Sequence, residues 1–293
     1  MQTPDWIAVD WGTSNMRAWA MSASGTVLAE VRSDKGMGDL TPDQFEDAFR
    51  DATNGWDINV PIVACGMVGA RQGWIEATYA AVPCPATPTG FTQPNSTLDV
   101  HIIPGLMQDS PADVMRGEET QIAGFLALNP NWDGVICLPG THTKWAHISA
   151  DEVISFQTYM TGDMFAALGD HTVLRHSVQS DDWDWDAFDT AVGDAMARPE
   201  RIAARLFSLR AEGLLNSMTN ATARARLSGL LIGAELAGAK PYWLGQQIAV
   251  IGAGNLTALY VRALALQSAP ATQVKGDAIT LAGLTAAYRR LKG

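Results

Sequence analysis

The same local pattern begins each half of the chain: a short apolar strand, a turn of glycine and hydroxyl residues, and a second apolar strand. In the first half, strand 6–9 leads into Asp10-Trp11-Gly12-Thr13-Ser14-Asn15-Met16-Arg17 and then into strand 18–21. In the second half, strand 134–138 leads into Pro139-Gly140-Thr141-His142-Thr143-Lys144-Trp145. Such turns can direct N–H groups and hydroxyls at a phosphate, although each one alone is more typical of an ordinary β-hairpin. The repetition predicts two domains, 1–130 and 131–293.

A third glycine turn lies near the C-terminus, where strand 247–251 leads into Gly252-Ala253-Gly254-Asn255 and a helix over 256–266. A dinucleotide-binding fingerprint needs another small residue at position 257, and Thr257 fits that requirement poorly. The sequence also lacks the Gly-Lys-Ser/Thr run of a P-loop. The three turns are better explained together, as the phosphate and adenosine contacts of a nucleotide held between two domains.

The remaining segments predict a mixed α/β protein. Thr41 and Gln44 form a capping-box pattern around Pro42, which predicts a helix ending near residue 53. Segment 61–65 is typical of a buried strand and precedes a glycine-spaced loop over 66–74. Further strands are expected at 26–32, 100–104, 143–148 and 153–158, and further helices at 118–128, 161–168, 199–209, 221–239 and 276–291.

Composition excludes several functional classes. The formal net charge of −11 opposes binding to nucleic acid or to an anionic membrane surface. The chain lacks a basic N-terminal signal region, and its longest apolar helix candidate is too short to span a bilayer. Cys65, Cys84 and Cys137 show no metal-type spacing and are expected to be small core residues. We therefore expect a cytoplasmic protein. Trp183 and Trp185 are expected to take part in core packing or in an interface.

The order and spacing of the three turns resemble those of the superfamily of acetate and sugar kinases, actin and the heat-shock ATPases. A closer resemblance, to the 2-dehydro-3-deoxygalactonokinase family, covers nearly the whole chain. It is carried by the turns at Asp10 and Pro139 and by Gly66-Met67-Val68-Gly69, Met115-Arg116-Gly117-Glu118-Glu119-Thr120-Gln121, Met160-Thr161-Gly162 and Ser228-Gly229-Leu230-Leu231-Ile232-Gly233-Ala234-Glu235.

This resemblance implies an α/β fold of two ribonuclease-H-like (actin-like ATPase) domains around a nucleotide cleft. The last helix would be able to pack back on the first domain. The family phosphorylates 2-dehydro-3-deoxy-galactonate at its 6-hydroxyl with ATP and Mg²⁺, in galactonate catabolism. A small sugar acid is then the expected partner. A homodimer is the default expectation for a soluble oligomer.

The resemblance also assigns nucleotide and metal contacts. Phosphoryl transfer needs positioned phosphates, Mg²⁺ and a base near the attacking hydroxyl. Asp10 is expected to hold Mg²⁺ through water, and His142 to shape its turn rather than to transfer protons. The expected nucleotide contacts come from all three turns: Gly12, Thr13, Ser14, Asn15, Gly140, Thr141, His142, Gly252, Gly254 and Asn255.

For the base we expect Glu118, which follows a glycine at a helix start, where related sugar kinases carry an acid. Glu119 is the close rival and Asp163 the third choice. Whichever glutamate is not the base would stabilise the helix N-terminus. Substrate contacts are expected from one apolar side chain and several cations: Arg17, Met67, Arg71, Arg116 and Lys144.

Some alternatives stay open at this level. Arg17 or Lys144 would serve equally well to stabilise charge on the transferred phosphate, and Arg71 is also typical of a solvated surface arginine. An exopolyphosphatase-like enzyme would use the Gly-Glu-Glu run to position water. An actin-like nucleotide-binding module would polymerise or switch and would not be an enzyme. The sequence does not distinguish galactonate-derived from gluconate-derived substrates, which differ at one hydroxyl.

Overall fold

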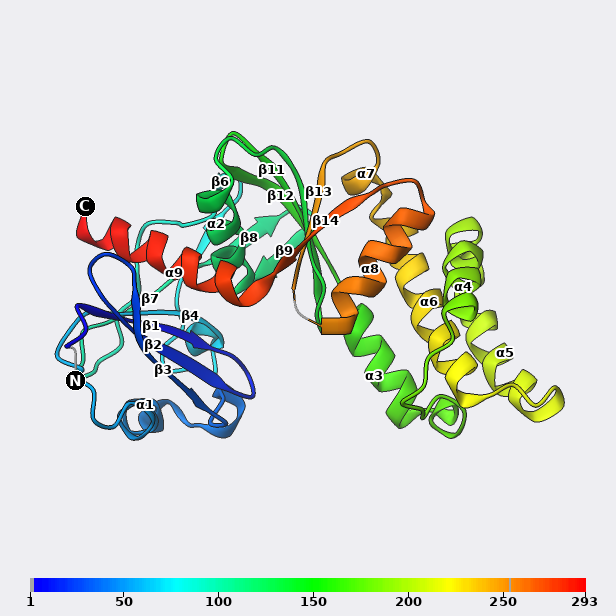
Figure 1. Cartoon of the computed structure of the whole chain (residues 1–293), viewed down its shortest axis with the longest axis horizontal. Coiled ribbons are helices and arrows are strands. Elements are labelled where there is room, and N and C mark those ends of the chain that lie inside the picture. Colours follow the sequence, from blue (N-terminus) through cyan, green and yellow to red (C-terminus); the bar gives the residue numbers. More distant parts are fainter. Residues whose placement is uncertain (1–2, 253) are drawn as a thin grey trace. The chain divides into compact units, whose positions relative to one another are not determined.

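The computed structural model describes residues 3–252 and 254–293, which form two compact units (Figure 1). The first unit contains the chain up to Asp133 together with Ile148–Ser155 and Gly276–Gly293. The second unit contains Gly134–His147 and Phe156–Lys275. Ala253, the central residue of the third glycine turn, lies outside the described residues.

The main sheet of the first unit has five strands in the order β3-β2-β1-β4-β7. β1 pairs antiparallel with β2 and parallel with β4. In this register Asp10 lies opposite Arg17 on one side and beside Cys65 on the other. The strands are β1 (Trp6–Trp11), β2 (Met16–Met21), β3 (Val27–Ser33), β4 (Ile62–Gly66) and β7 (Val100–Ile102).

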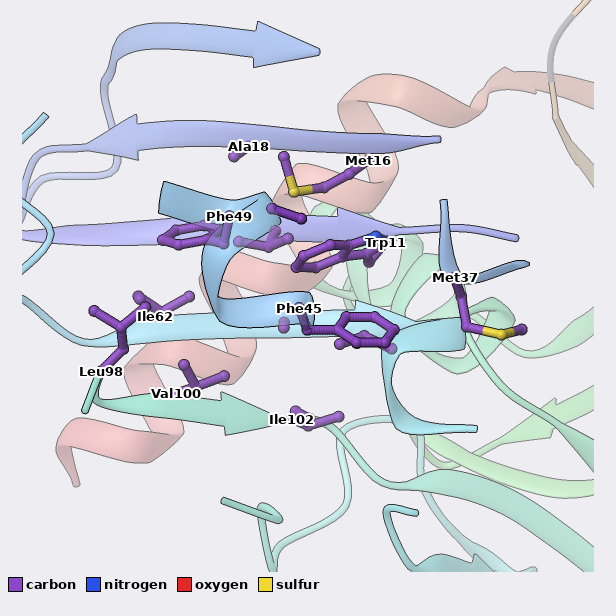
Figure 2. Close-up of a cluster of buried hydrophobic side chains, with 14 of the residues drawn as sticks. Trp11, Met16, Ala18, Met37, Phe45, Phe49, Ile62, Leu98, Val100 and Ile102 are labelled. Atoms are coloured by element: carbon purple, nitrogen blue, oxygen red, sulfur yellow. The ribbon is translucent and has the colours of Figure 1, made fainter. Parts of the chain in front are cut away.

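One face of this sheet packs on α1 (Phe45–Ala52) and on the loops around it (Figure 2). The ring of Trp11 lies 4.9 Å from that of Phe45, and Phe45 stacks on Trp74 at 5.9 Å. The predicted capping box is confirmed: the Thr41 N–H donates to the Gln44 side chain, and a 3₁₀ turn, Pro42–Gln44, leads into the helix.

The opposite face of the sheet carries α9 (Gly276–Lys292), the last helix of the chain (Figure 1). Tyr288 of this helix stacks on Trp6 of β1 at 4.3 Å between ring centroids. α9 also packs closely on α2 (Glu118–Leu128), since a Cβ on Gly124 would lie 2.7 Å from the Gly283 nitrogen. The C-terminal helix is thus an integral part of the first unit.

The first unit also contains a small sheet that the sequence patterns did not predict. Its strands are ordered β5-β8-β9, and β8 pairs parallel with β5 and antiparallel with β9. The short β6 pairs antiparallel with the first residues of β12 (Glu152–Tyr159). The bounds are β5 (Tyr79–Ala81), β6 (Cys84–Pro85), β8 (Gly105–Asp109) and β9 (Ala112–Met115).

The sheet of the second unit has its strands in the order β14-β13-β10-β11-β12. β13 pairs parallel with both β10 and β14. β14 was not expected from the sequence. The strands are β10 (Gly134–Leu138), β11 (Thr143–Ser149), β12 (Glu152–Tyr159), β13 (Ile248–Gly252) and β14 (Ala271–Lys275).

Helices cover this second sheet, and α4 and α6 pack against each other at short range. A Cβ on Gly229 would lie 2.5 Å from the Phe188 carbonyl oxygen, and one on Gly233 would lie 2.6 Å from that of Val192. The α-helices are α3 (Thr161–His171), α4 (Trp185–Ala197), α5 (Ile202–Leu215), α6 (Asn220–Gly238), α7 (Lys240–Trp243) and α8 (Gly254–Leu266). The other 3₁₀ turns are Met37–Asp39, Met67–Gly69, Val173–His176 and Pro199–Arg201. Among the residues described, no helix has the length and apolar character needed to cross a membrane.

Candidate active site

Asp10 lies near the end of β1 with its carboxylate partly exposed to solvent. Its Oδ2 forms an ion pair with Arg17 Nη2 at 2.9 Å, and the Cys65 thiol lies 3.9 Å from its Oδ1. Burial, and then the negative charges of Asp10 and Glu119, raise the pKa of the Cys65 thiol well above its usual value. Cys65 is therefore a neutral neighbour of the acid rather than a thiolate.

Arg17 is held between two carboxylates of the first unit. In addition to Asp10 it contacts Asp277, in the first turn of α9, at 2.6 Å. Burial lowers the pKa of Arg17, but the hydrogen bonds to Asp277 and Asp10 outweigh this effect and raise it. The guanidinium therefore carries a full charge that is already paired on two sides.

The first glycine turn has exposed side chains, and hydrogen bonds fix its backbone. Thr13, Ser14 and Asn15 are exposed, while the Gly12 N–H donates to the Asn15 carbonyl at 2.8 Å. The following loop supports the turn, because Gly38 donates its N–H to the Thr13 carbonyl at 2.8 Å. The turn thus presents the exposed hydroxyls of Thr13 and Ser14 on a backbone that hydrogen bonds hold in place.

Two glycines bring the start of α2 close to Asp10. Gly66 ends β4 at φ +90°, and a Cβ there would lie 2.8 Å from the Trp11 carbonyl oxygen and 3.5 Å from Asp10 Oδ1. Gly117, at φ +104°, would place a Cβ 3.4 Å from the Gly66 Cα. Both positions are in the left-handed region that favours glycine. The structure therefore brings together Asp10, the Gly66 turn and the two glutamates that open α2.

The two glutamates at the start of α2 differ in exposure. Glu119 is fully buried; its Oε2 accepts the Gly117 N–H at 2.6 Å and its Oε1 accepts the Thr120 hydroxyl at 2.9 Å. Burial, followed by the charge of Glu118, raises the pKa of Glu119 to about 7. Glu118 is only half-buried and accepts the Arg116 N–H at 3.1 Å. Of this pair, only Glu118 has a side chain that solvent reaches.

Arg116 and Arg71 of the first unit also differ in how far solvent reaches their side chains. Arg116 donates Nη2–H to the Ala77 carbonyl at 2.7 Å and lies over the Tyr79 ring at 4.3 Å, while its Nε and Nη1 are buried without a hydrogen-bond partner in the described structure. Arg71, on the loop after the Met67–Gly69 turn, is exposed. Met67 is half-buried against the core.

In the second unit, α3 begins directly against the second glycine turn. The Asp163 N–H donates to the Thr141 carbonyl at 3.0 Å, and a Cβ on Gly162 would lie 2.7 Å from the Thr141 Cα. His142 Nε2 lies 3.0 Å from Asp163 Oδ2, and both side chains are exposed by nearly half. Asp163 is thus paired with the turn itself. Lys144, two residues further, is buried in β11 with 5% of its surface exposed.

A cavity of about 580 Å³ within the second unit joins the second and third glycine turns. It extends from the second turn and the start of α3 to the start of α8, and α4 and α6 contribute other parts of its wall. Its lining includes Gly140, Thr141, Thr161, Trp183, Arg224 and Asn255. Thr257, which fitted a dinucleotide fingerprint poorly, packs behind the third turn, 2.7 Å from where a Gly252 Cβ would lie.

Two expectations from the sequence are confirmed only in part. Trp183 does pack on the core, but it also lines the cavity with Trp185, which is 44% exposed. Cys65 and Cys137 are buried as expected, whereas Cys84 is only half-buried in the short β6. Tryptophan spacing alone does not distinguish a ring buried in a core from one at the wall of a cavity.

Sequence reasoning did not predict the ion pair between Asp277 and Arg17. It also did not predict that Thr161 and Arg224 line the cavity, or that Glu235 is buried. Glu235 is 3% exposed inside a helix whose other buried residues are apolar apart from Ser228. An acid on the buried face of an apolar helix is a signal that the sequence does carry. The pairing with Asp277 has no local signal, because the residues are far apart in the chain.

A hairpin with a glycine and hydroxyl turn in each unit, and a cavity beside the second of these turns, accompany a two-domain actin-like fold. The activator of 2-hydroxyisocaproyl-CoA dehydratase from Clostridium difficile, solved with bound ADPNP, shares this fold with a TM-score of 0.52 at 10% identity. That alignment covers 100% of this chain and 96% of the activator. The chain belongs to the 2-keto-3-deoxy-galactonokinase family, whose model matches residues 10–287.

Individual relatives agree with this family. The 2-dehydro-3-deoxygalactonokinase of Escherichia coli (strain K12) is 33% identical, over 96% of this chain and 97% of its own length. The "Probable 2-dehydro-3-deoxygalactonokinase" of Rhizobium meliloti (strain 1021) is 40% identical, over 97% of this chain and 96% of its own. A crystal structure described as such a kinase, from Sinorhizobium meliloti, has a TM-score of 0.91 at 39% identity, covering 98% of this chain and 99% of its own. The phosphohydrolase and actin-like alternatives are not favoured.

Proposed function

We propose that this protein transfers the terminal phosphoryl group of ATP to the 6-hydroxyl of 2-dehydro-3-deoxy-D-galactonate. The products are 2-dehydro-3-deoxy-6-phospho-D-galactonate and ADP. Membership of the family supports the acceptor. The observation that carries the nucleotide part is the cavity in which the second glycine turn and Asn255 meet.

The cavity fits the parts of a nucleotide in a definite order. Gly140 and Thr141 lie at the N-terminus of α3, where the helix dipole and free N–H groups favour an anion. The rings of Trp183 and Trp185 lie edge to face at 5.9 Å and offer an aromatic wall for the base. We assign the phosphates to the turn and the adenosine to the wall formed by α4, α6 and the start of α8.

Asp10 fits the metal that such a reaction uses. Mg²⁺ is bound by one or two carboxylates, by water and by the phosphates of its nucleotide rather than by a cage of protein ligands. In keeping with that chemistry, residues 3–252 and 254–293 contain no group of three or more His, Cys, Asp or Glu suited to hold a metal. When bound, Mg²⁺ neutralises charge on the phosphates, and Asp10 would hold it through water.

Glu118 is the base that the geometry supports best. It lies at the start of α2, and solvent reaches it. The preceding residue, Gly117, lies against Gly66, which in turn lies against Asp10. A base must come within hydrogen-bond distance of the proton that it accepts. Glu119 is fully buried with both oxygens in use, and Asp163 is paired with His142. We therefore assign Glu119 to holding the α2 start and Asp163 to the second turn.

Arg71 is the cation that we assign to the substrate carboxylate. It is exposed on the loop that follows Met67, and no ion pair involving it is found among the described residues. Arg116 instead holds that loop, because its buried guanidinium lies against Gly69 and Ala77. For Arg17 and Lys144 we choose the alternative role left open by the sequence, stabilising charge on the transferred phosphate. A free carboxylate gains most from a cation that is not already neutralised.

The test is ADP formation by the purified protein with a panel of 2-dehydro-3-deoxy sugar acids. ADP formation that depends on the galactonate-derived acid supports the proposal, and the gluconate-derived epimer measures specificity at one hydroxyl. Phosphate release from polyphosphate, with no acceptor-dependent ADP, would refute it. A cytoplasmic location and a homodimer are part of the proposal; sedimentation velocity tests the dimer.

A further inference from the structure

Glu235 is a buried acid that the proposed reaction does not use. Its Oε1 accepts the indole N–H of Trp145 at 2.7 Å. Its Oε2 accepts the hydroxyl of Tyr260 at 2.6 Å and also the hydroxyl of Thr161. All four residues belong to the second unit, and each comes from a different element: α6, β11, α8 and α3. One carboxylate therefore collects three donors from three separate parts of the unit.

These donors flank the second glycine turn on both sides. Trp145 lies on β11, just after the turn, and Tyr260 extends the contact to Thr143, the first residue of that strand, at 2.9 Å. Thr161 opens α3, whose Asp163 N–H donates to the Thr141 carbonyl at 3.0 Å. The strand that leaves the turn and the helix that supports it are thus anchored to the same side chain.

The three hydrogen-bond partners of Glu235 in the described structure are all uncharged. The titratable groups that face it are Tyr260 from α8, Tyr159 from β12 and Cys137 from β10. Burial, followed by the charge of Glu235, raises the pKa of all three, that of Tyr159 to about 12. They stay neutral in the physiological range. The exposed His142–Asp163 ion pair lies on the turn that these partners flank.

We infer that Glu235 is a positioning residue: its ionised carboxylate holds Thr161 and β11 so that Gly140 and Thr141 are preset for the phosphates of the nucleotide. This inference rests on the proposed binding of ATP in the cavity. Glu235 itself does not line that cavity, whereas its partners Thr161 and Tyr260 do. It therefore acts through these side chains and not by touching the ligand.

Protonation should weaken this arrangement for a geometric reason. A carboxylate only accepts hydrogen bonds, so it suits three donors; a carboxylic acid carries a proton of its own, so the Thr161 or Tyr260 hydroxyl must reverse to accept it, and the hydrogen bonds lose their charge assistance. Burial raises the pKa of Glu235 to about 7, although the three hydrogen bonds oppose the rise. Nucleotide affinity should therefore fall as the pH is lowered through that value.

The experiment measures the affinity of the whole protein for ADP by calorimetry, without sugar acid, from about pH 6 to about pH 8.5. Glu235→Gln is nearly isosteric and mimics the protonated acid at every pH. Glu212→Gln is the matched control. Glu212 lies on α5, is partly exposed and forms an ion pair with Arg226 of α6. Comparing the variants with the wild type at each pH cancels every pH effect that all three proteins share.

We expect Glu235→Gln to bind ADP about tenfold more weakly than the wild type at about pH 8, a difference of about 1.4 kcal/mol, and nearly equally at about pH 6. Glu212→Gln should follow the wild type throughout. Hydrogen exchange at the Asp163 amide should be faster in Glu235→Gln, because that N–H reports the contact between α3 and the turn. In steady state the KM for ATP should rise while the KM for the sugar acid stays constant.

A second variant covers the case in which Glu235→Gln does not fold. Trp145→Phe removes one donor but keeps the acid, so the midpoint of the affinity change should move to higher pH. An unchanged midpoint, or a Glu235→Gln affinity equal to that of the wild type at every pH, overturns the inference alone. A wild-type protein that binds no nucleotide overturns the proposed function and this inference with it.

Discussion

Replacing Gly162 by alanine should displace the second glycine turn without harming α3 itself. Gly162 does not have a left-handed backbone, and alanine inside a helix is favoured over glycine by about 1 kcal/mol. The added Cβ would nevertheless lie 2.7 Å from the Thr141 Cα, which is 0.7 Å inside the 3.4 Å at which ordinary contact begins. The Gly140 carbonyl oxygen lies closer still. Both obstacles are backbone atoms, so the turn or the helix must move.

The size of the effect follows from that overlap. Relief requires a shift of about 1 Å at atoms that we assign to the nucleotide phosphates, and a misplacement of that size costs about a hundredfold in rate. Overpacking of this kind also costs about 1–3 kcal/mol of stability. We therefore expect kcat/KM for ATP to fall about a hundredfold in Gly162→Ala, with a moderate loss of thermal stability.

Gly169→Ala is the matched control, because Gly169 lies in the same helix and its Cβ would make an ordinary contact, 3.6 Å from Val178 Cγ2. Steady-state kinetics with ATP and sugar acid, together with thermal unfolding, are measured on both variants. Gly169→Ala should retain wild-type kinetics and at least wild-type stability. A Gly162→Ala enzyme with a wild-type kcat/KM for ATP would show that the contact between α3 and the turn does not position the nucleotide.

Three further outcomes test other parts of the structure. Glu118→Gln should lower kcat by about 10²- to 10⁴-fold with ADP affinity unchanged, measured by steady-state kinetics and calorimetry; near-normal turnover would remove Glu118 as the base. Asp10→Asn should lose Mg²⁺-dependent activity, and an unchanged Mg²⁺ titration would contradict its assignment. Glu235→Gln should be the more stable protein above about pH 7: the folded pKa of about 7 exceeds the ordinary 4.5, so ionisation costs the wild type about 3 kcal/mol of folding free energy as the pH rises through that window. Thermal unfolding at about pH 5 and about pH 8 measures this, and a variant equally destabilised at both values would refute it.

These outcomes separate stability from function at Glu235. An acid retained only for the fold should be replaceable by glutamine with no loss of nucleotide affinity. A gain in stability joined to a loss of affinity at the same pH would show that the buried charge serves the turn. Buried ionised groups are costly to the fold, which makes this combination informative.

The sequence by itself determined most local structure. The capping box at Thr41, helix 118–128, strand 134–138 and both glycine turns follow from spacing within a few residues, and the structure reproduces them. Such signals survive because hydrogen-bond caps, apolar periodicity and glycine turns act over one or two turns of chain. The family resemblance, carried by the same local runs, agrees with the comparisons.

The tertiary structure alone decided which of these residues meet. Glu118 and Glu119 are adjacent in the sequence, and only the packing of α2 against α9 and of Gly117 against Gly66 leaves one accessible and buries the other. Arg17 meets Asp277 across most of the chain length, and Glu235 meets three donors from three elements. Local patterns carry no information about contacts between distant segments, because those contacts depend on how whole elements pack.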